Sequence, residues 1–173
     1  LKKIGKRRHD TVFVEGCHDN YDLLREYPKV PYRGGTARKI SGNVYQLLRG
    51  EIYEICGKKV FAFGGGDSEE QSLNGSRWWP EEQPSEEEQA YGVENLRKCR
   101  GQVDIIVTHD APAVIKQFIR MEDTEASCIH MYLDYIAKQC DFKEWYFGRY
   151  HMDKVVPPRY YAMFQEIRPA GAR

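Results

Sequence analysis

The alternation of apolar and polar residues predicts strands along most of the chain. Three short β-branched and aromatic runs are typical of buried strands: 11–14, 103–108 and 145–147. Period-two alternation predicts three more: 44–48, 51–55 and 59–63. Cys56-Gly57-Lys58 supplies a tight turn between the last two, and a final strand is expected over 160–167.

Helical spacing of apolar residues predicts four helices: 21–27, 85–99, 113–120 and 125–139. Ser85 and Glu88 form a capping-box pair at the start of the second of these. The segment 67–85 is rich in Gly, Pro, Ser and acidic residues and is predicted to be a long loop. Hairpins that alternate with helices predict a layered α/β (α+β) fold in a single domain, 1–173.

Composition and charge exclude several classes of protein. The chain has 173 residues, of which 41% are hydrophobic and 30% charged, as is usual for one soluble globular domain. No apolar run reaches the roughly 20 residues of a membrane span, and no signal-peptide stretch follows the basic first residues. The 26 basic and 26 acidic residues cancel, which argues against nucleic acid as a partner. Five cysteines without a Cys-x-x-Cys pair indicate a reducing, cytoplasmic setting.

The main chemical signal is a histidine placed just after a short strand, which occurs three times. His18, His109 and His151 each follow one of the three buried runs. Because loops at the carboxyl ends of strands converge, we expect these side chains to line a common cleft. Neutral imidazoles suit a borderline metal ion, and a carboxylate such as Asp19 could orient one ring. His9 and His130 lack this context, so we interpret both as structural.

Three ordered motifs resemble those of the calcineurin-like metallophosphoesterases, especially the small bacterial ones. They are Gly16-Cys17-His18-Asp19, Thr108-His109 and Gly148-Arg149-Tyr150-His151. In that family Gly-Asn-His-Asp/Glu, a lone strand-end His and Gly-His-x-His follow in this order. The segments 48–55 and 78–82 also look like the small bacterial subgroup.

The resemblance implies a β-sandwich flanked by helices, with the amino-terminal strands missing. The family opens with Asp-x-His and then Gly-Asp, whose carboxylate bridges two metals. No Asp-x-His occurs here, and the only Gly-Asp, Gly66-Asp67, comes in the wrong order. We therefore expect the chain to be the carboxyl-terminal portion of such a domain.

The family likeness also implies residue roles. Two divalent transition metals (zinc, manganese or iron) would activate a hydroxide that attacks the phosphorus of a small phosphorylated substrate. His18 would stabilise charge or protonate the leaving oxygen, with Asp19 as its orienting partner. His109 and His151 would be metal ligands.

Two departures from the family pattern affect the second metal. Cys17 replaces an Asn ligand, and it is either a thiolate ligand that favours zinc or a small buried thiol. Arg149 replaces a His ligand and cannot ligate, so it either binds the substrate phosphate or pairs with an acid at the rim. We expect one metal ion or none in this chain.

Two functional hypotheses follow. The leading one is a metal-dependent phosphoesterase, for phosphomonoesters or phosphodiesters, whose complete form is active while this chain alone is inactive or impaired. The alternative is a degenerate, inactive phosphoesterase fold that serves as a phosphate- or protein-binding scaffold. A truncated sheet would leave an edge that a partner chain could cover, so an oligomer is conceivable.

Trp78 and Trp79 could stack on a substrate, but we favour their packing of the long loop onto the domain.

Overall fold

The computed structural model describes residues 1–68, 78–121 and 126–171, which form two mixed sheets with helices. The sheets have the strand orders β1-β4-β3-β2 and β5-β6-β7-β8-β10-β9. Four α-helices lie in these ranges: α1 (Tyr21–Glu26), α3 (Glu86–Lys98), α4 (Ala113–Arg120) and α5 (Cys128–Gln139). The predicted α/β class is therefore confirmed, and none of the helices described is long and apolar enough to cross a membrane.

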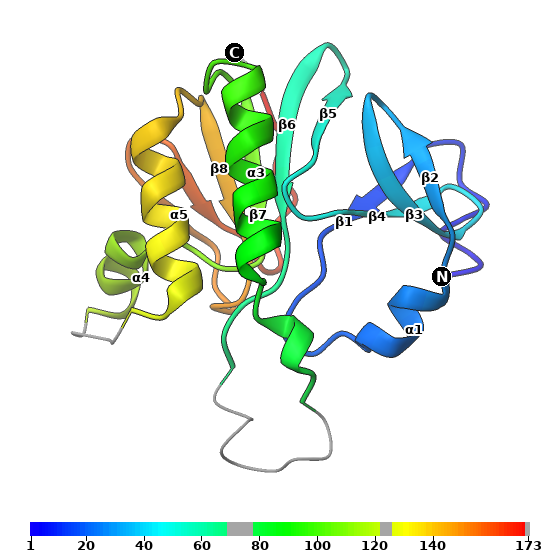
Figure 1. The fold of residues 1–173 in the computed structure, drawn as a ribbon, viewed down its shortest axis with the longest axis horizontal. Coiled ribbons are helices and arrows are strands. Elements are labelled where there is room, and N and C mark those ends of the chain that lie inside the picture. The colour runs from blue at the N-terminus through cyan, green and yellow to red at the C-terminus, as the bar shows by residue number, and fades with distance from the viewer. Residues whose placement is uncertain (69–77, 122–125, 172–173) are drawn as a thin grey trace.

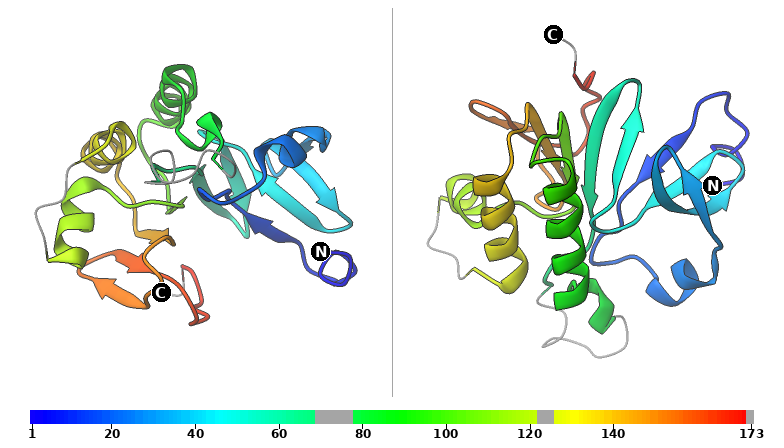
Figure 2. Two further views of the ribbon diagram at one scale, coloured as in Figure 1. Left: turned by 90° about the horizontal axis from the view of Figure 1, so that it is seen from below. Right: turned by 45° about the horizontal axis from the view of Figure 1, so that its top comes forward.

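The larger sheet is parallel at its centre and antiparallel at both edges. Its strands are β5 (Ile52–Ile55), β6 (Lys58–Phe63), β7 (Ile105–Thr108), β8 (Glu144–Phe147), β9 (Lys154–Val156) and β10 (Tyr160–Ala162). The strands β6, β7, β8 and β10 pair in parallel. Helices α3 and α5 lie side by side over one face of this sheet (Figures 1 and 2). Trp145, Phe61 and Ile106 are fully buried in the core with Leu133 and Ile136 of α5.

The smaller sheet carries the amino-terminal part of the chain. Its strands are β1 (Thr11–Phe13), β2 (Lys29–Tyr32), β3 (Gly35–Ser41) and β4 (Val44–Leu47). β1 pairs in parallel with β4, whereas β2, β3 and β4 form an antiparallel meander. Ala37 and Leu47 of this sheet pack with Tyr53 and Ala62 of the larger one, so a second apolar cluster joins the two sheets.

Three strands were not predicted from the sequence: β2, β3 and β9. β2 and β3 form a hairpin whose turn residues Arg33 and Gly34 both have positive φ (50° and 91°). Pro31 in β2 and the irregular pairing of β3 after Lys39 hide the period-two signal. The predicted final strand over 160–167 is wrong in its length, because β10 ends at Ala162.

The predicted helices are confirmed with small changes at their ends. Glu88 N donates to Ser85 Oγ (3.2 Å) and Ser85 N to Glu88 Oε2 (3.0 Å), which is the predicted capping box of α3. α5 begins at Cys128, and part of the predicted start of this helix lies outside the described residues. The predicted long loop is described only at its two ends, which include the 3-10 helix η1 (Pro80–Glu82).

The two tryptophans of that loop pack onto the domain, as favoured from the sequence. Trp79 Nε1 donates to Asp22 Oδ2 on α1 (3.0 Å), and the Trp79 ring lies near that of Tyr21 (6.4 Å between centroids). Trp78 Nε1 donates to the buried carboxylate of Glu82 (2.9 Å). The end of the long loop is thereby held against α1.

Candidate functional site

Four strand ends, those of β1, β6, β7 and β8, bring their loops together beside His109. β7 and β8 are parallel, with Thr108 opposite Phe147, and the N–H of Gly148 donates to the carbonyl of His109 (3.1 Å). The loop after β1 arrives from the smaller sheet, where the N–H of Cys17 donates to His109 Nε2 (3.3 Å). We call this region the loop cluster: residues 15–19, 64–67, 108–111 and 148–150.

Glycine is required at two places where the loops touch. A Cβ atom on Gly16 would come within 2.7 Å of His109 Cε1. A Cβ atom on Gly66 would meet Cys17 Sγ at 2.7 Å and Arg149 Nη1 at 2.8 Å. These distances are shorter than ordinary contacts, so the absence of side chains here allows the four loops to close on one another.

His109 is a neutral hydrogen-bond acceptor at physiological pH. Burial lowers the pKa of its imidazole to about 4, although the nearby carboxylate of Asp110 opposes the shift. Its Nε2 accepts the N–H of Cys17, which places the ring proton on Nδ1. The ring therefore holds the loop after β1 against the end of β7.

The guanidinium of Arg149 points into the loop cluster. Its Nη1 lies 2.9 Å from Cys17 Sγ and 3.3 Å from Asp110 Oδ2, and its Nη2 donates to the carbonyl of Asp67. A left-handed backbone at Arg149 (φ 60°) accompanies this orientation. Its acidic partner is thus a buried carboxylate rather than one at the rim.

Cys17 has the surroundings of a small buried thiol. Its side chain is 2% exposed, and burial raises its pKa to about 12, although Arg149 opposes the shift. Burial therefore favours the protonated thiol in these surroundings.

Asp110, which the sequence interpretation did not single out, is the buried acid at the centre of the cluster. Its Oδ1 accepts from the Tyr150 hydroxyl (2.6 Å) and the Ala111 N–H (2.8 Å). Its Oδ2 lies 3.1 Å from Nε2 of His130 on α5. Burial raises its pKa, but contacts with His130 and Arg149 outweigh burial and lower it to about 2. The sequence did contain a signal for a buried partner of His130, because His130 lies between Ile129 and Leu133 on the buried face of α5.

The other predicted site residues, His18, Asp19 and His151, lie at the margin of the loop cluster. His18 is exposed, and Asp19 Oδ2 accepts the N–H of Gly16 (2.7 Å), which closes the turn after β1. His151 is also exposed, and its ring packs against Phe164 (5.1 Å between centroids). The structure thus joins Cys17 and Arg149 to His109, and directs the His151 ring elsewhere.

The residues described do not fit the two-metal centre that the family likeness implies. Within residues 1–68, 78–121 and 126–171, no three His, Cys, Asp or Glu side chains form a group that could hold a metal ion. The Arg149 cation lies against Cys17 and Asp110, where it would repel a metal.

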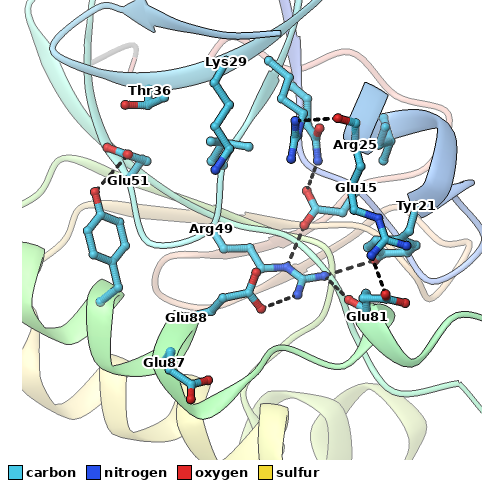
Figure 3. A pocket seen from close by; sticks show the side chains of 15 residues that line it. Glu15, Tyr21, Arg25, Lys29, Thr36, Arg49, Glu51, Glu81, Glu87 and Glu88 are labelled. Carbon is cyan, nitrogen blue, oxygen red and sulfur yellow. Dashed lines mark hydrogen bonds and ion pairs between the residues drawn. The ribbon is translucent and has the colours of Figure 1, made fainter. Parts of the chain in front are cut away.

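A buried ion pair fixes the position of the loop after β1. Glu15 and Arg49 are both buried, and Arg49 Nε donates to Glu15 Oε1 at 2.7 Å (Figure 3). Arg49 also donates to Glu88 Oε2 of α3 (2.7 Å) and to the carbonyl of Glu81 in η1 (2.7 Å). One side chain thereby ties β1, η1 and α3 together beside the loop cluster.

Comparisons of the chain with protein-family models, curated proteins and solved structures find no match. The likeness to calcineurin-like phosphoesterases therefore depends on the motifs of the loop cluster.

Proposed function

We propose that this chain is a phosphoesterase-like domain that binds a phosphate group without hydrolysing its ester. The observation that carries the proposal is the Arg149 guanidinium, which lies 2.9 Å from Cys17 Sγ and 3.3 Å from Asp110 Oδ2. In the related enzymes the corresponding position would be a histidine ligand. Here a permanent cation without ligating capacity lies among the side chains that a metal would need.

The atoms that could take part in metal chemistry are already engaged within the chain. Cys17 Sγ receives a hydrogen bond from Arg149, and His109 Nε2 receives one from the Cys17 N–H. Asp110 is shared among Tyr150, His130, Arg149 and a backbone N–H. Hydrogen bonds and ion contacts within the chain thus already occupy the atoms that a metal would need. This supports a binding role over a hydrolytic one.

Arg149 retains capacity for an anion. A guanidinium has five N–H donors, and the side chain is 21% exposed, so its outer edge can reach a phosphate oxygen. A bidentate contact from such a fork suits a phosphate group.

The test compares hydrolysis and binding in the full chain. We expect no turnover of bis-p-nitrophenyl phosphate with added Mn²⁺ or Zn²⁺, and binding of inorganic phosphate that weakens about tenfold in Arg149→Gln, the loss expected for one charge-assisted contact. Arg97→Gln, an exposed arginine of α3, is the matched control and should bind as the parent does. Equal phosphate affinity in the parent and Arg149→Gln would overturn the binding role.

The second candidate is metal-dependent hydrolysis of a phosphomonoester or phosphodiester. It is supported by the convergence of the strand-end loops on a neutral His109. Turnover of roughly 1 per second or more that is lost in His109→Ala would establish it and refute the non-hydrolytic proposal. Elemental analysis of Arg149→His adds a second readout, because replacing the cation by an imidazole should raise the metal content if Arg149 excludes a metal.

A further inference from the structure

A pocket of about 620 Å³ lies between the smaller sheet, α1 and the beginning of α3 (Figure 3). It shares Glu15 with the loop cluster, and its other lining residues lie outside that cluster. Its volume lies in the range of pockets that bind small molecules. The side chains around it are mostly charged, which indicates a polar ligand.

One wall of the pocket is a row of three side chains across the smaller sheet. Lys29 of β2 is directly opposite Arg38 of β3, and Arg38 is directly opposite Gln46 of β4. Residues that are opposite one another point to the same face of a sheet, and all three line the pocket. The pocket therefore receives two adjacent cations and an amide from one face.

Neither cation of the row forms an ion pair with a described acidic residue, although the Glu15 carboxylate attracts Arg38 from a longer distance. The Lys29 ammonium group makes no hydrogen bond or ion pair with the residues described, and Figure 3 shows this side chain extending into the pocket. Arg38 Nη1 donates only to the carbonyls of Arg25 (3.2 Å) and Tyr27 (2.9 Å). Like charges that are directly opposite in a sheet destabilise it. An anion bound between Lys29 and Arg38 would remove this repulsion.

Gln46 provides an independent observation that points to a ligand. Its side chain is 5% exposed, and its Nε2 donates to Glu15 Oε2 (2.9 Å). Its Oε1 is buried and has no hydrogen-bond partner in the described part of the chain. A buried acceptor without a donor costs free energy, so an N–H donor at this position would be favourable.

The opposite wall is acidic. Glu81 and Glu88 are bound by Arg25 and Arg49, respectively. Glu51 accepts only the Tyr91 hydroxyl (3.0 Å), and Glu87 of α3 has no basic partner among the residues described. These carboxylates favour a positively charged group in the same pocket. The pocket is thus dipolar, with a cationic and an acidic side.

We propose that this pocket binds a short aminoalkyl phosphate, with the phosphate on Lys29 and Arg38 and the ammonium group donating to Gln46 Oε1. The spacing of neighbouring strands, about 4.8 Å, matches the separation of the two charges in such a molecule. Two cations suit a phosphate dianion, and the Glu15 carboxylate beside Gln46 suits the ammonium group. The proposal concerns a different site from the loop cluster and holds whether or not that cluster is catalytic.

Phosphoethanolamine is the probe, and it is titrated into the full chain by calorimetry beside inorganic phosphate and ethanolamine. We expect phosphoethanolamine to bind about tenfold more tightly than phosphate, the effect of one added charge-assisted hydrogen bond. Lys29→Gln should weaken its binding by about tenfold for the same reason. Lys39→Gln is the matched control, because Lys39 is the exposed neighbour of Arg38 on β3 and points to the other face.

Each other outcome would overturn the proposal. Equal affinities for phosphoethanolamine and phosphate would refute the role of Gln46. Equal losses in Lys29→Gln and Lys39→Gln would show that only general charge matters. Arg149→Gln tests the alternative location: if its loss of phosphoethanolamine affinity equals or exceeds that of Lys29→Gln, the ligand binds in the loop cluster and the proposal is refuted. Far-ultraviolet circular dichroism confirms that each variant is folded before titration.

Discussion

Replacing Arg49 by Met would leave the Glu15 carboxylate buried without its charged partner. The two side chains are only 6% and 4% exposed, so water cannot substitute for the lost contacts. The substitution also removes the donors to Glu88 and to the Glu81 carbonyl. The loop after β1 would lose its attachment to η1 and α3 at the same time.

The structure sets the size of the expected effect. Removing one partner of a buried pair costs about 3–5 kcal/mol, because the remaining charge is uncompensated. Arg25 offers the matched control, since it also pairs with a glutamate, Glu81 (2.6 Å), but its side chain is 51% exposed. Arg25→Met should cost at most about 1 kcal/mol, because solvent screens an exposed pair.

Urea unfolding of the two variants and the parent measures both losses as changes in the free energy of unfolding. The double variant Glu15→Gln/Arg49→Met should recover part of the loss, since no unpaired charge then remains buried. If Arg49→Met and Arg25→Met differ by less than about 1 kcal/mol, the assigned role of the buried pair is wrong.

Two further predictions concern His109 and the contact between α3 and α5. The pKa of His109 is about 4 in the folded chain and near 6.5 when unfolded, so the unfolded chain binds the proton first as the pH falls. Up to about 3 kcal/mol of stability, present above pH 6.5, should therefore be lost towards pH 4. Urea unfolding at several pH values between 6.5 and 4, with a chelator present, should show that the free energy of unfolding changes less with pH in His109→Gln than in the parent. Equal pH dependences in the two proteins would contradict this. Among the residues described, the buried Tyr132 hydroxyl has no hydrogen-bond partner, and a Cβ atom on Gly92 would clash with it, so Gly92→Ala should cost about 1–3 kcal/mol. It should cost less in a Tyr132→Phe background, and equal costs by thermal or urea unfolding would refute the proposed clash.

The sequence predicted the parts of the site that follow from one strand and the loop after it. His109 after β7 and Cys17 after β1 have this form, and their loops do meet. The Asp110 to His130 contact could not be found in this way, because it joins a loop to the buried face of a helix that is distant in the sequence. Arg149 has an orientation that depends on its left-handed backbone, which no side-chain pattern encodes.

The missed hairpin β2–β3 has a related cause. β2 has four residues, one of which is Pro31, and a proline argues against a strand. In β3 the buried residues Ala37 and Ile40 are three positions apart, and the pairing with β4 shifts register between Lys39 and Ser41. The proline and this irregularity hide the period-two signal.

The parallel pairings dictate an order of assembly. The meander from β2 to β4 and the hairpin of β5 and β6 join strands that are adjacent in the sequence, so each can form with little loop-closure entropy. β1 pairs with β4 across the whole β2–β3 hairpin, and β7 reaches β6 only after α3. Non-local pairings of this kind form slowly. Cys17 and His109 can meet only when both pairings are complete, so the contact between them reports on the joint pairing of β1 with β4 and of β7 with β6.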